Sequence, residues 1–519
     1  MKKKSIDWTA ILLILSVLVV LSAYTNTNVL LGDSQGYAVL ANNLITYNSY
    51  TLDGITPHVQ WTWGFPIYLV PFVAIFGEIN GMIIGNIFAG LLLAILSFIF
   101  FRLFFNKILS AILTLLLVSS PFVFFFIKNP HSEILFTSVI LGIAIILFKY
   151  YKTHKLISSM IIAVLIGITA NIRAPGVFVL LPVIFYMYMS DRSQYKIKDS
   201  HAKKISNRKD RLLNKLKTDY SCFLRYAIVI VIALAISSIW YIRNYIVSKS
   251  VTSYLDVSNS LGFNYSFSAI YNNIIYYFNP IHTVFPVLFI FVILGLFVIF
   301  RVFCYGKKDS RAAKISPSDF DGPMTFTLLL FIFSLMSFYF FWAYHSYRFF
   351  VPIIPFVLVV AGMGINYAYA RYKAVTVVFL VLGVVISTFF LAIFSYGSIY
   401  DFTEKIGLNP FPEDSNWFCQ YQNNLDSLVK EQPQVFHGNS TVFMLGTNTM
   451  FGAQGIDFSS LVWSKDKDRF GDVRLVDKLQ DAEYVVVVSP EQAKDYDFSR
   501  GYSVVALKNN PSIIIYRKN

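Results

Sequence analysis

The sequence predicts an all-α polytopic membrane domain of about eleven transmembrane helices, with interfacial helices in the first outer loop, followed by a small C-terminal extracytoplasmic α/β domain. Of the 519 residues, 56% are hydrophobic and 14% are charged, whereas soluble domains carry about 25% charged residues. The mean hydropathy is +0.58, and apolar stretches repeat along roughly three quarters of the chain, as expected when lipid is the main solvent. After residue 396 the composition becomes more polar. A water-soluble enzyme is therefore largely excluded.

The net charge of +14 indicates topology rather than a nucleic-acid partner. In a soluble protein such an excess suggests nucleic acid, but here the basic residues gather in alternate loops. We therefore expect the lipid bilayer as a partner and no nucleic acid. The three cysteines are too few for a disulfide framework.

Eleven stretches approach the roughly 20 apolar residues that a transmembrane helix needs. They cover residues 9–26, 80–101, 108–127, 133–149, 156–172, 175–190, 225–243, 281–301, 324–343, 349–369 and 374–395. Lys2–Lys4 and the apolar run behind them resemble a signal peptide, but the stretch that follows lacks a small-residue cleavage pattern. We therefore predict an uncleaved first helix and a transmembrane domain over residues 1–395.

The two sides of this membrane domain differ sharply in basic residues. One side holds 26 Lys and Arg, eleven of them between Arg192 and Arg225, and the opposite side holds five. The positive-inside rule makes the richer side cytoplasmic, with the N-terminus inside and the C-terminal domain outside. We expect a multi-pass protein of a prokaryotic cell membrane. The basic run from Arg192 to Lys217 is interpreted as a solvated loop attracted to anionic lipid head groups.

The C-terminal region, residues 396–519, has 12 Lys and Arg against 16 Asp and Glu. A helix-like segment covers residues 417–430, and β-rich runs cover Thr441–Leu445, Tyr484–Val488, Tyr502–Leu507 and Ile513–Tyr516. The Asn509-Asn510-Pro511 turn predicts that the last two runs form a hairpin. We therefore predict a small α/β domain here.

The first outer loop, from about Asn26 to Asn80, contains two segments that are too short to span a bilayer. After Asp33, five apolar residues share one helical face: Tyr37, Leu40, Ala41, Leu44 and Ile45. The 14-residue apolar segment Gly64–Gly77 carries Pro66 and Pro71. Both segments are interpreted as helices that lie in the membrane interface.

The order of several motifs on the outer side resembles GT-C-type glycosyltransferases, the group that contains dolichyl-phosphate-mannose protein mannosyltransferases and bacterial aminoarabinose transferases. The first loop carries the acid at Asp33 followed by Tyr37, and then the Trp63-Gly64-Phe65-Pro66 entry to a second interfacial helix. Further matches are Pro130-His131-Ser132-Glu133, Asn171-Ile172-Arg173-Ala174-Pro175, Arg243-Asn244-Tyr245 and Tyr347-Arg348-Phe349-Phe350-Val351-Pro352. The resemblance covers roughly residues 1–370.

The resemblance implies transfer of a sugar from a polyprenyl-phosphate donor to a protein, lipid or glycan acceptor on the outer face. It makes Asp33 the general base that accepts the acceptor's proton. A purely structural role for Asp33 is to cap the helix behind it. Glu133 is the second catalytic candidate: it would orient the acceptor or pair with an Arg, unless it only complements a helix dipole. The first loop has Asp-Ser where many relatives have two acids, which argues against a two-carboxylate site.

Three outer arginines, Arg173, Arg243 and Arg348, are the candidate ligands of the donor phosphate, because a guanidinium group matches phosphate oxygens. The alternative is that each only anchors the protein at the interface. The candidate surface for the sugar or acceptor consists of aromatic residues, although an interfacial aromatic belt would explain them equally well. These residues are Tyr37, Trp61, Trp63 and Tyr68.

We predict no metal and no cofactor, since the outer histidines show no metal-ligand spacing, and a divalent metal site assembled in space is the open alternative. A secondary transporter predicts charges in mid-span and two similar halves, and neither is evident. An oligosaccharyltransferase predicts a Trp-Trp-Asp-type motif in the tail, which is absent from the sequence. The open alternative is a non-enzymatic flippase or export component for polysaccharide or lipid-linked sugar.

Overall fold

The computed structural model describes residues 7–26, 33–52, 57–59, 61–202, 208–249, 286–305, 322–340 and 347–395, short helical pieces between 267 and 274, and five strands after residue 440. The chain forms two compact units. The first, here called the helical unit, comprises Met1–Val29, Val59–Leu69 and Met82–Pro410. The second comprises Leu30–His58, Val70–Gly81 and Phe411–Asn519. The predicted boundary at residues 395 and 396 stays a prediction.

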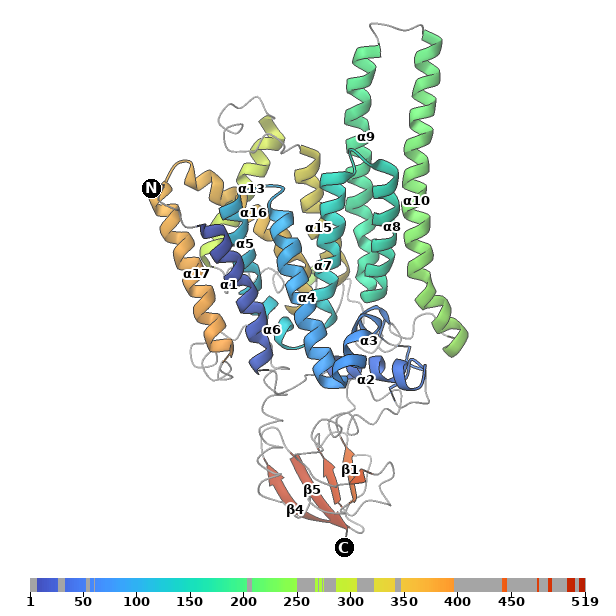
Figure 1. The fold of residues 1–519 in the computed structure, drawn as a ribbon, viewed down its shortest axis with the longest axis vertical. Helices are drawn as coiled ribbons and strands as arrows, with labels where there is room; N and C mark the ends of the chain where they lie inside the picture. Colours follow the sequence, from blue (N-terminus) through green and yellow to red (C-terminus); the bar gives the residue numbers. More distant parts are fainter. Residues whose placement is uncertain are drawn as a thin grey trace. The chain divides into compact units, whose positions relative to one another are not determined.

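Helices dominate the described part of the chain up to residue 395 (Figure 1). They are α1 Trp8–Ser22, η1 Ala23–Asn26, α2 Asp33–Thr46, α3 Gly64–Phe76, α4 Glu78–Phe101, α5 Lys107–Val118, α6 Pro121–Lys128, α7 Ser132–Ile145, η2 Ile146–Tyr150, α8 Lys155–Ile172, η3 Ala174–Val179, α9 Leu180–Ala202, α10 Arg208–Ser248, α13 Pro286–Tyr305, α15 Gly322–Phe340, η5 Tyr347–Ile353, α16 Ile354–Tyr369 and α17 Lys373–Ser395. Each of the eleven apolar stretches predicted to span contains helix.

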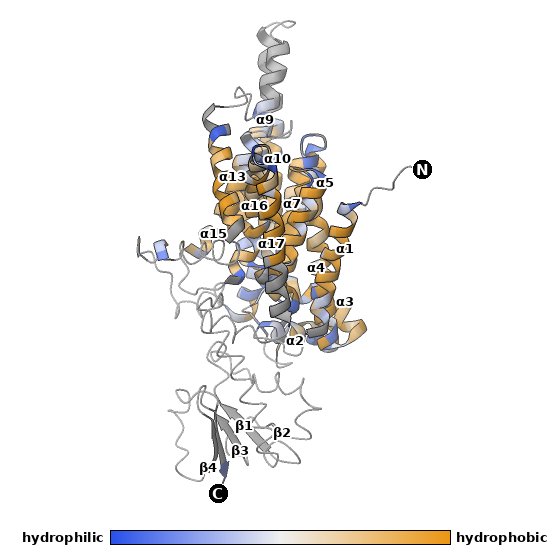
Figure 2. Cartoon of the chain, turned by 90° about the vertical axis from the view of Figure 1, so that its left-hand side faces the viewer, coloured by the Kyte–Doolittle hydropathy of each residue, from blue (hydrophilic) through white to orange (hydrophobic). Residues whose placement is uncertain are grey.

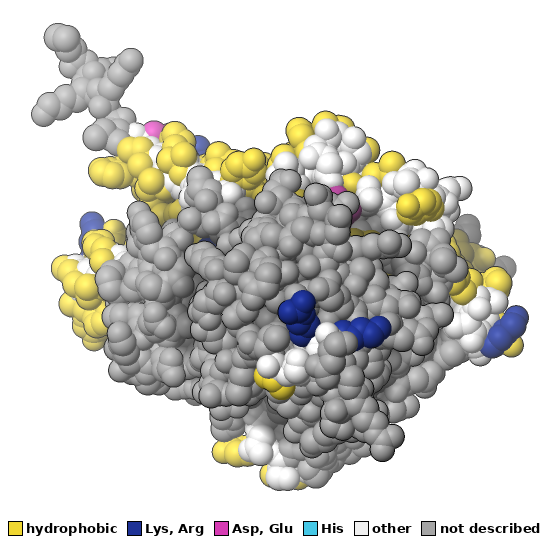
Figure 3. Space-filling view, turned by 90° about the horizontal axis from the view of Figure 1, so that it is seen from below, with side chains coloured by type: hydrophobic (Ala, Val, Ile, Leu, Met, Phe, Trp, Pro, Cys, Tyr) yellow, Lys and Arg dark blue, Asp and Glu magenta, His cyan; other side chains and the backbone are white. Residues whose placement is uncertain are grey.

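Seven of the described helices are long and apolar enough to cross a membrane, and an eighth candidate is the pair α5 and α6, bent by 61°. The bend lies where Pro121 begins α6, since proline lacks the N–H that would continue the ladder of α5. Figure 2 shows hydrophobic residues along most of the length of these helices. In the space-filling view of Figure 3, hydrophobic side chains likewise cover much of the described surface on that face. The described helices up to residue 395 are therefore those of a polytopic helical membrane protein, and the total of eleven spans stays a prediction.

A cluster of phenylalanine rings forms part of the core of the helical unit. Phe331 of α15 stacks on Phe356 of α16 with ring centroids 4.8 Å apart, and Phe100 of α4 meets Phe356 edge-on at 5.4 Å. Phe148 of η2 packs against Phe331 and Phe100. Because these rings come from distant parts of the sequence, they tie α4, η2, α15 and α16 into one bundle.

The basic run predicted as a solvated loop is helical over most of its length. Helix α9 continues to Ala202 and α10 already begins at Arg208, and both extend past the neighbouring ends of α7 and α8 (Figure 1). The loop prediction was wrong for these residues, because it relied on apolar periodicity, and Lys and Arg are themselves good helix formers.

The second unit contains a five-stranded sheet with the order β2-β1-β3-β5-β4. The strands are β1 Thr441–Leu445, β2 Arg474–Leu475, β3 Tyr484–Val487, β4 Tyr502–Lys508 and β5 Ile513–Lys518. Strand β1 pairs in parallel with β2 and β3, and β4 pairs antiparallel with β5. The predicted pairing of the last two strands is thus confirmed, and the predicted helix at 417–430 lies outside the described residues.

Candidate functional site

Glu133 is buried at the start of α7. Its side chain is 1% exposed, in the first helical turn, where the positive end of the helix dipole favours an acid. His131, two positions before Glu133 and directly before α7, is also buried, and its Nδ1 is 2.9 Å from the carbonyl oxygen of Asn129. Glu133 therefore occupies the helix-start position that the sequence suggested, and it also has charged partners.

Two of the predicted phosphate ligands form ion pairs with this carboxylate. Arg173, the residue that follows α8, donates from Nη1 to Glu133 Oε1. Arg348, in η5, places its Nε 3.7 Å from the same oxygen. Arg173 Nη1 is also 3.4 Å from the hydroxyl oxygen of Ser132. Three residues separated by up to 215 positions thus meet in one place, here called the Glu133 cluster.

An aromatic ring flanks both guanidinium groups. Phe349 lies 5.5 Å from the Cζ of Arg173 and 5.1 Å from the Cζ of Arg348, distances at which a cation is attracted to a ring. Phe349 in turn stacks on Tyr339 of α15 with centroids 4.2 Å apart. The ring pair therefore restricts the orientations that the two guanidinium groups can adopt. Neither Phe349 nor Tyr339 was a predicted site residue, although Phe349 belongs to the motif that contains Arg348.

The two oxygens of the Glu133 carboxylate differ in how the described residues use them. Glu133 Oε2 is buried and accepts no hydrogen bond from the described residues. Buried carboxylate oxygens are normally satisfied, so a gap of this kind calls for a functional explanation. The Glu133 cluster thus pairs two cations with a carboxylate whose second oxygen is unused.

Trp63, a predicted sugar-binding residue, holds the start of α3 against the end of α8. Its indole N–H donates to Asn171 Oδ1 at 2.7 Å, and Asn171 Nδ2 donates to the carbonyl of Ile236 in α10 at 2.9 Å. The contact is close, since a Cβ added at Gly64 would lie 2.6 Å from the Asn171 carbonyl oxygen. Because Asn171 is two residues before Arg173, this junction positions the backbone of the cluster.

Arg243 lies in a separate set of contacts on α10. Its guanidinium lies 5.1 Å from the ring of Trp240 and donates to Asn244 Oδ1 at 3.0 Å. Asn244 Nδ2 donates to the carbonyl of Val59, and Trp240 contacts Trp63 with centroids 6.1 Å apart. Arg243 is therefore linked to the Trp63 junction, and its role in phosphate binding stays a prediction.

The other predicted aromatic residues are buried or partly buried. Trp61 is buried, and the hydroxyl of Tyr68 donates to the carbonyl of Gly85 in α4 at 2.8 Å. In the second unit, α2 begins at the partly buried Asp33 and buries Tyr37. The predicted helix after Asp33 is thus present, and the catalytic and binding roles of these four residues stay predictions.

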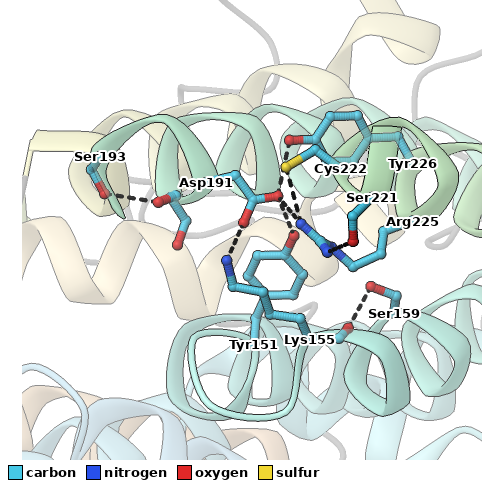
Figure 4. Close-up of polar contacts among 10 residues, drawn as sticks. Tyr151, Lys155, Ser159, Asp191, Ser193, Ser221, Cys222, Arg225 and Tyr226 are labelled. Atoms are coloured by element: carbon cyan, nitrogen blue, oxygen red, sulfur yellow. Dashed lines mark hydrogen bonds and ion pairs between the residues drawn. The ribbon is translucent and has the colours of Figure 1, made fainter. Parts of the chain in front are cut away.

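A second buried cluster, missed by the sequence analysis, lies at the other end of α8 (Figure 4). Asp191 of α9 accepts from Lys155 through Oδ1 at 2.6 Å. Its Oδ2 accepts from Tyr151 at 2.9 Å, from Arg225 at 2.8 Å and from Tyr226 at 3.1 Å. Burial, and then the Asp191 charge, raise the pKa of the Tyr151 phenol. This Asp191 cluster joins α8, α9 and α10.

The described residues contain no group of three or more His, Cys, Asp or Glu that could hold a metal. The expectation of a metal-independent site stays a prediction.

Comparison with known proteins finds the fold but no sequence relative. Neither a protein-family profile nor a curated protein matches the sequence. Among solved structures, the chain is similar to ArnT from Cupriavidus metallidurans bound to undecaprenyl phosphate, with a TM-score of 0.52, 12% identity and coverage of 98% of this chain and 97% of that chain. It is also similar to ArnT in the apo state, with a TM-score of 0.50, 12% identity and coverage of 98% and 96%.

These matches extend over nearly the whole of both chains. The protein is a multi-pass helical membrane protein with the fold of ArnT. The resemblance to GT-C-type glycosyltransferases, predicted from the outer motifs, is thereby confirmed at the level of the fold.

Proposed function

We propose that the protein is an integral membrane glycosyltransferase that moves a sugar from a polyprenyl-phosphate donor to an acceptor on the outer face of the membrane. The observation that carries the proposal is the Glu133 cluster, in which Arg173 and Arg348 meet at one carboxylate. The cluster belongs to a fold shared with a protein that was solved with undecaprenyl phosphate bound. Two adjacent guanidinium groups are a favourable phosphate site.

In the proposed reaction, a hydroxyl or amine of the acceptor attacks the anomeric carbon of the sugar. The bond between that carbon and the phosphate oxygen breaks, and its electron pair leaves with the polyprenyl phosphate. Asp33 takes the acceptor's proton as general base. Arg173 and Arg348, with Arg243 as a third ligand, stabilise the charge on the departing phosphate. No step requires an oxidant or a reductant.

The activity is tested by incubating purified protein with a panel of radiolabelled polyprenyl-phosphate sugars. An extract of the membrane in which the protein occurs supplies the acceptor. With the wild-type protein, we expect the label of one donor to move to an acceptor. With the Arg173→Ala, Arg348→Ala double variant, we expect no transfer. An export or flippase component would move the lipid-linked sugar across the membrane without transferring the label. Lipid movement without transfer would therefore replace the proposal with that alternative.

The Asp33 assignment predicts that the charge of this side chain is essential. Asp33→Asn should keep folding and donor binding and lower turnover by roughly 100-fold or more, the usual contribution of a general base. If Asp33 only supports the start of α2, Asn would serve equally well, and Asp33→Ala alone would cost about 1 kcal/mol of stability. Transfer rate and thermal unfolding of both variants separate the two roles, and near-native turnover in Asp33→Asn contradicts the assignment.

The proposed outer location of the site depends on the 26-to-5 asymmetry in basic residues. It predicts that a reporter active only in the cytoplasm, fused after Asn519, is silent. The same reporter inserted between Ala202 and Arg208 should be active and serves as the control. Activity after Asn519 with silence at the inserted position would reverse the sidedness.

A further inference from the structure

The Glu133 cluster combines two positive charges with one negative charge. Both guanidinium groups approach Glu133 Oε1, and opposite charges at such distances favour the ionised carboxylate. The three side chains therefore carry a formal charge of +1. A phosphate that binds the two arginines shares them with a carboxylate that repels it.

The charge on the phosphate changes during the proposed reaction. A sugar linked to a polyprenyl phosphate is a phosphodiester with a single negative charge. After transfer the lipid carries a phosphate monoester, whose charge is about −1.5 to −2 at pH 7 because its second pKa is about 6. Without a compensating charge, two arginines would hold this product more tightly than the donor.

We propose that Glu133 is a positioning residue that lowers the net positive charge of the cluster, so that the doubly charged phosphate product is held less tightly, relative to the singly charged phosphodiester donor, than two unopposed arginines would hold it. This inference rests on the proposed function. Glu133 anchors both guanidinium groups through one oxygen, while its buried second oxygen accepts no hydrogen bond from the described residues. Its negative charge is therefore only partly offset by hydrogen bonding and still acts on a bound anion.

The size of the effect follows from Coulomb's law. The repulsion between Glu133 and a bound phosphate is proportional to the phosphate charge. Removing the carboxylate charge should therefore increase the affinity for the monoester about twice as much, on a logarithmic scale, as the affinity for the diester. With partial screening we expect gains of roughly tenfold and threefold, respectively.

The test measures binding of two probes to the full chain in lipid nanodiscs at about pH 8, where the monoester is doubly charged. The probes are undecaprenyl phosphate and its methyl diester, which share the lipid and differ in charge. Wild-type protein should prefer undecaprenyl phosphate over the methyl diester by less than about tenfold, because the carboxylate offsets one of the two guanidinium charges. Glu133→Gln should increase the affinity for undecaprenyl phosphate roughly tenfold and the affinity for the methyl diester roughly threefold. Glu133→Asp keeps the charge and should retain the wild-type ratio of the two affinities.

The Asp191 cluster supplies a matched control, because Asp191→Asn also neutralises a buried carboxylate that lies between two cations. That variant should leave both affinities unchanged. An unchanged ratio in Glu133→Gln, or equal weakening of both probes, would overturn the inference while leaving the proposed function in place. A wild-type preference for undecaprenyl phosphate of more than about tenfold would overturn it without any variant. Failure of wild-type protein to bind either probe would instead contradict the proposed function.

Discussion

The two ends of α8 each carry a buried carboxylate between two cations, and they differ in how fully that carboxylate is used. Asp191 accepts four hydrogen bonds through both oxygens. Glu133 uses Oε1 for both arginines and leaves Oε2 without a hydrogen bond from the described residues. A carboxylate with both oxygens hydrogen-bonded holds helices together, whereas a carboxylate with one oxygen left over keeps capacity for a ligand.

The separation of the two clusters fits a membrane protein. The 18 residues of α8 span roughly 27 Å at 1.5 Å per residue, close to the thickness of about 30 Å of the hydrocarbon core. Lys155 begins the helix and Arg173 follows its last residue. The two clusters therefore lie near opposite edges of the apolar layer, where charged side chains are tolerated best.

The largest stability effect is expected at Asp191. Replacing it with Ala leaves Lys155 and Arg225 partly buried without their shared carboxylate, and losing one partner of such a pair costs about 3 to 5 kcal/mol. Thermal unfolding in nanodiscs should show this loss of stability. The control variant Arg192→Ala removes a neighbouring charge and should leave the stability unchanged. If Asp191→Ala left stability intact, the cluster would not be the joint between α8, α9 and α10.

A smaller effect is expected at the opposite end of α8, in Trp63→Phe. This change removes the indole N–H that donates to the buried Asn171, and an unsatisfied buried acceptor costs about 1 to 3 kcal/mol. The aromatic face is retained, so a stacking role for Trp63 would survive the change. Reduced stability with retained donor binding would show that Trp63 serves the junction between α3 and α8. Retained stability with weakened donor binding would show that Trp63 binds the sugar.

Several elements of the fold could be predicted from the sequence because their signals are local. Apolar length indicated the helices now seen as α4, α8 and α16, and the Asn509-Asn510-Pro511 turn indicated the pairing of β4 with β5. Strand β2, Arg474–Leu475, was missed because two residues are too few for an alternating pattern. The helical continuation of α9 and α10 was missed because a polar helix has no apolar stripe.

For the site, the sequence could indicate which residues matter but not which ones meet. Glu133, Arg173 and Arg348 were chosen separately as charged groups at span ends, and their contact depends on η5 packing beside the start of α7. Asp191 was passed over because it directly precedes a run of Lys and Arg and looked like one more exposed charge. Asp191 lies at the end of an apolar span, and Lys155 lies at the start of the preceding span. An acid and a base placed in this way were the signal that could have found the cluster.

We propose that the Glu133 cluster, and not the Asp191 cluster, binds the phosphate of a polyprenyl lipid. The most direct measurement is the affinity of the protein in nanodiscs for undecaprenyl phosphate in the wild type, in Arg348→Ala and in Lys155→Ala. Loss of Arg348 should weaken binding by roughly 30-fold, equivalent to about 2 kcal/mol, and loss of Lys155 should leave it unchanged. Equal affinity in the wild type and Arg348→Ala, or a loss confined to Lys155→Ala, would contradict the claim.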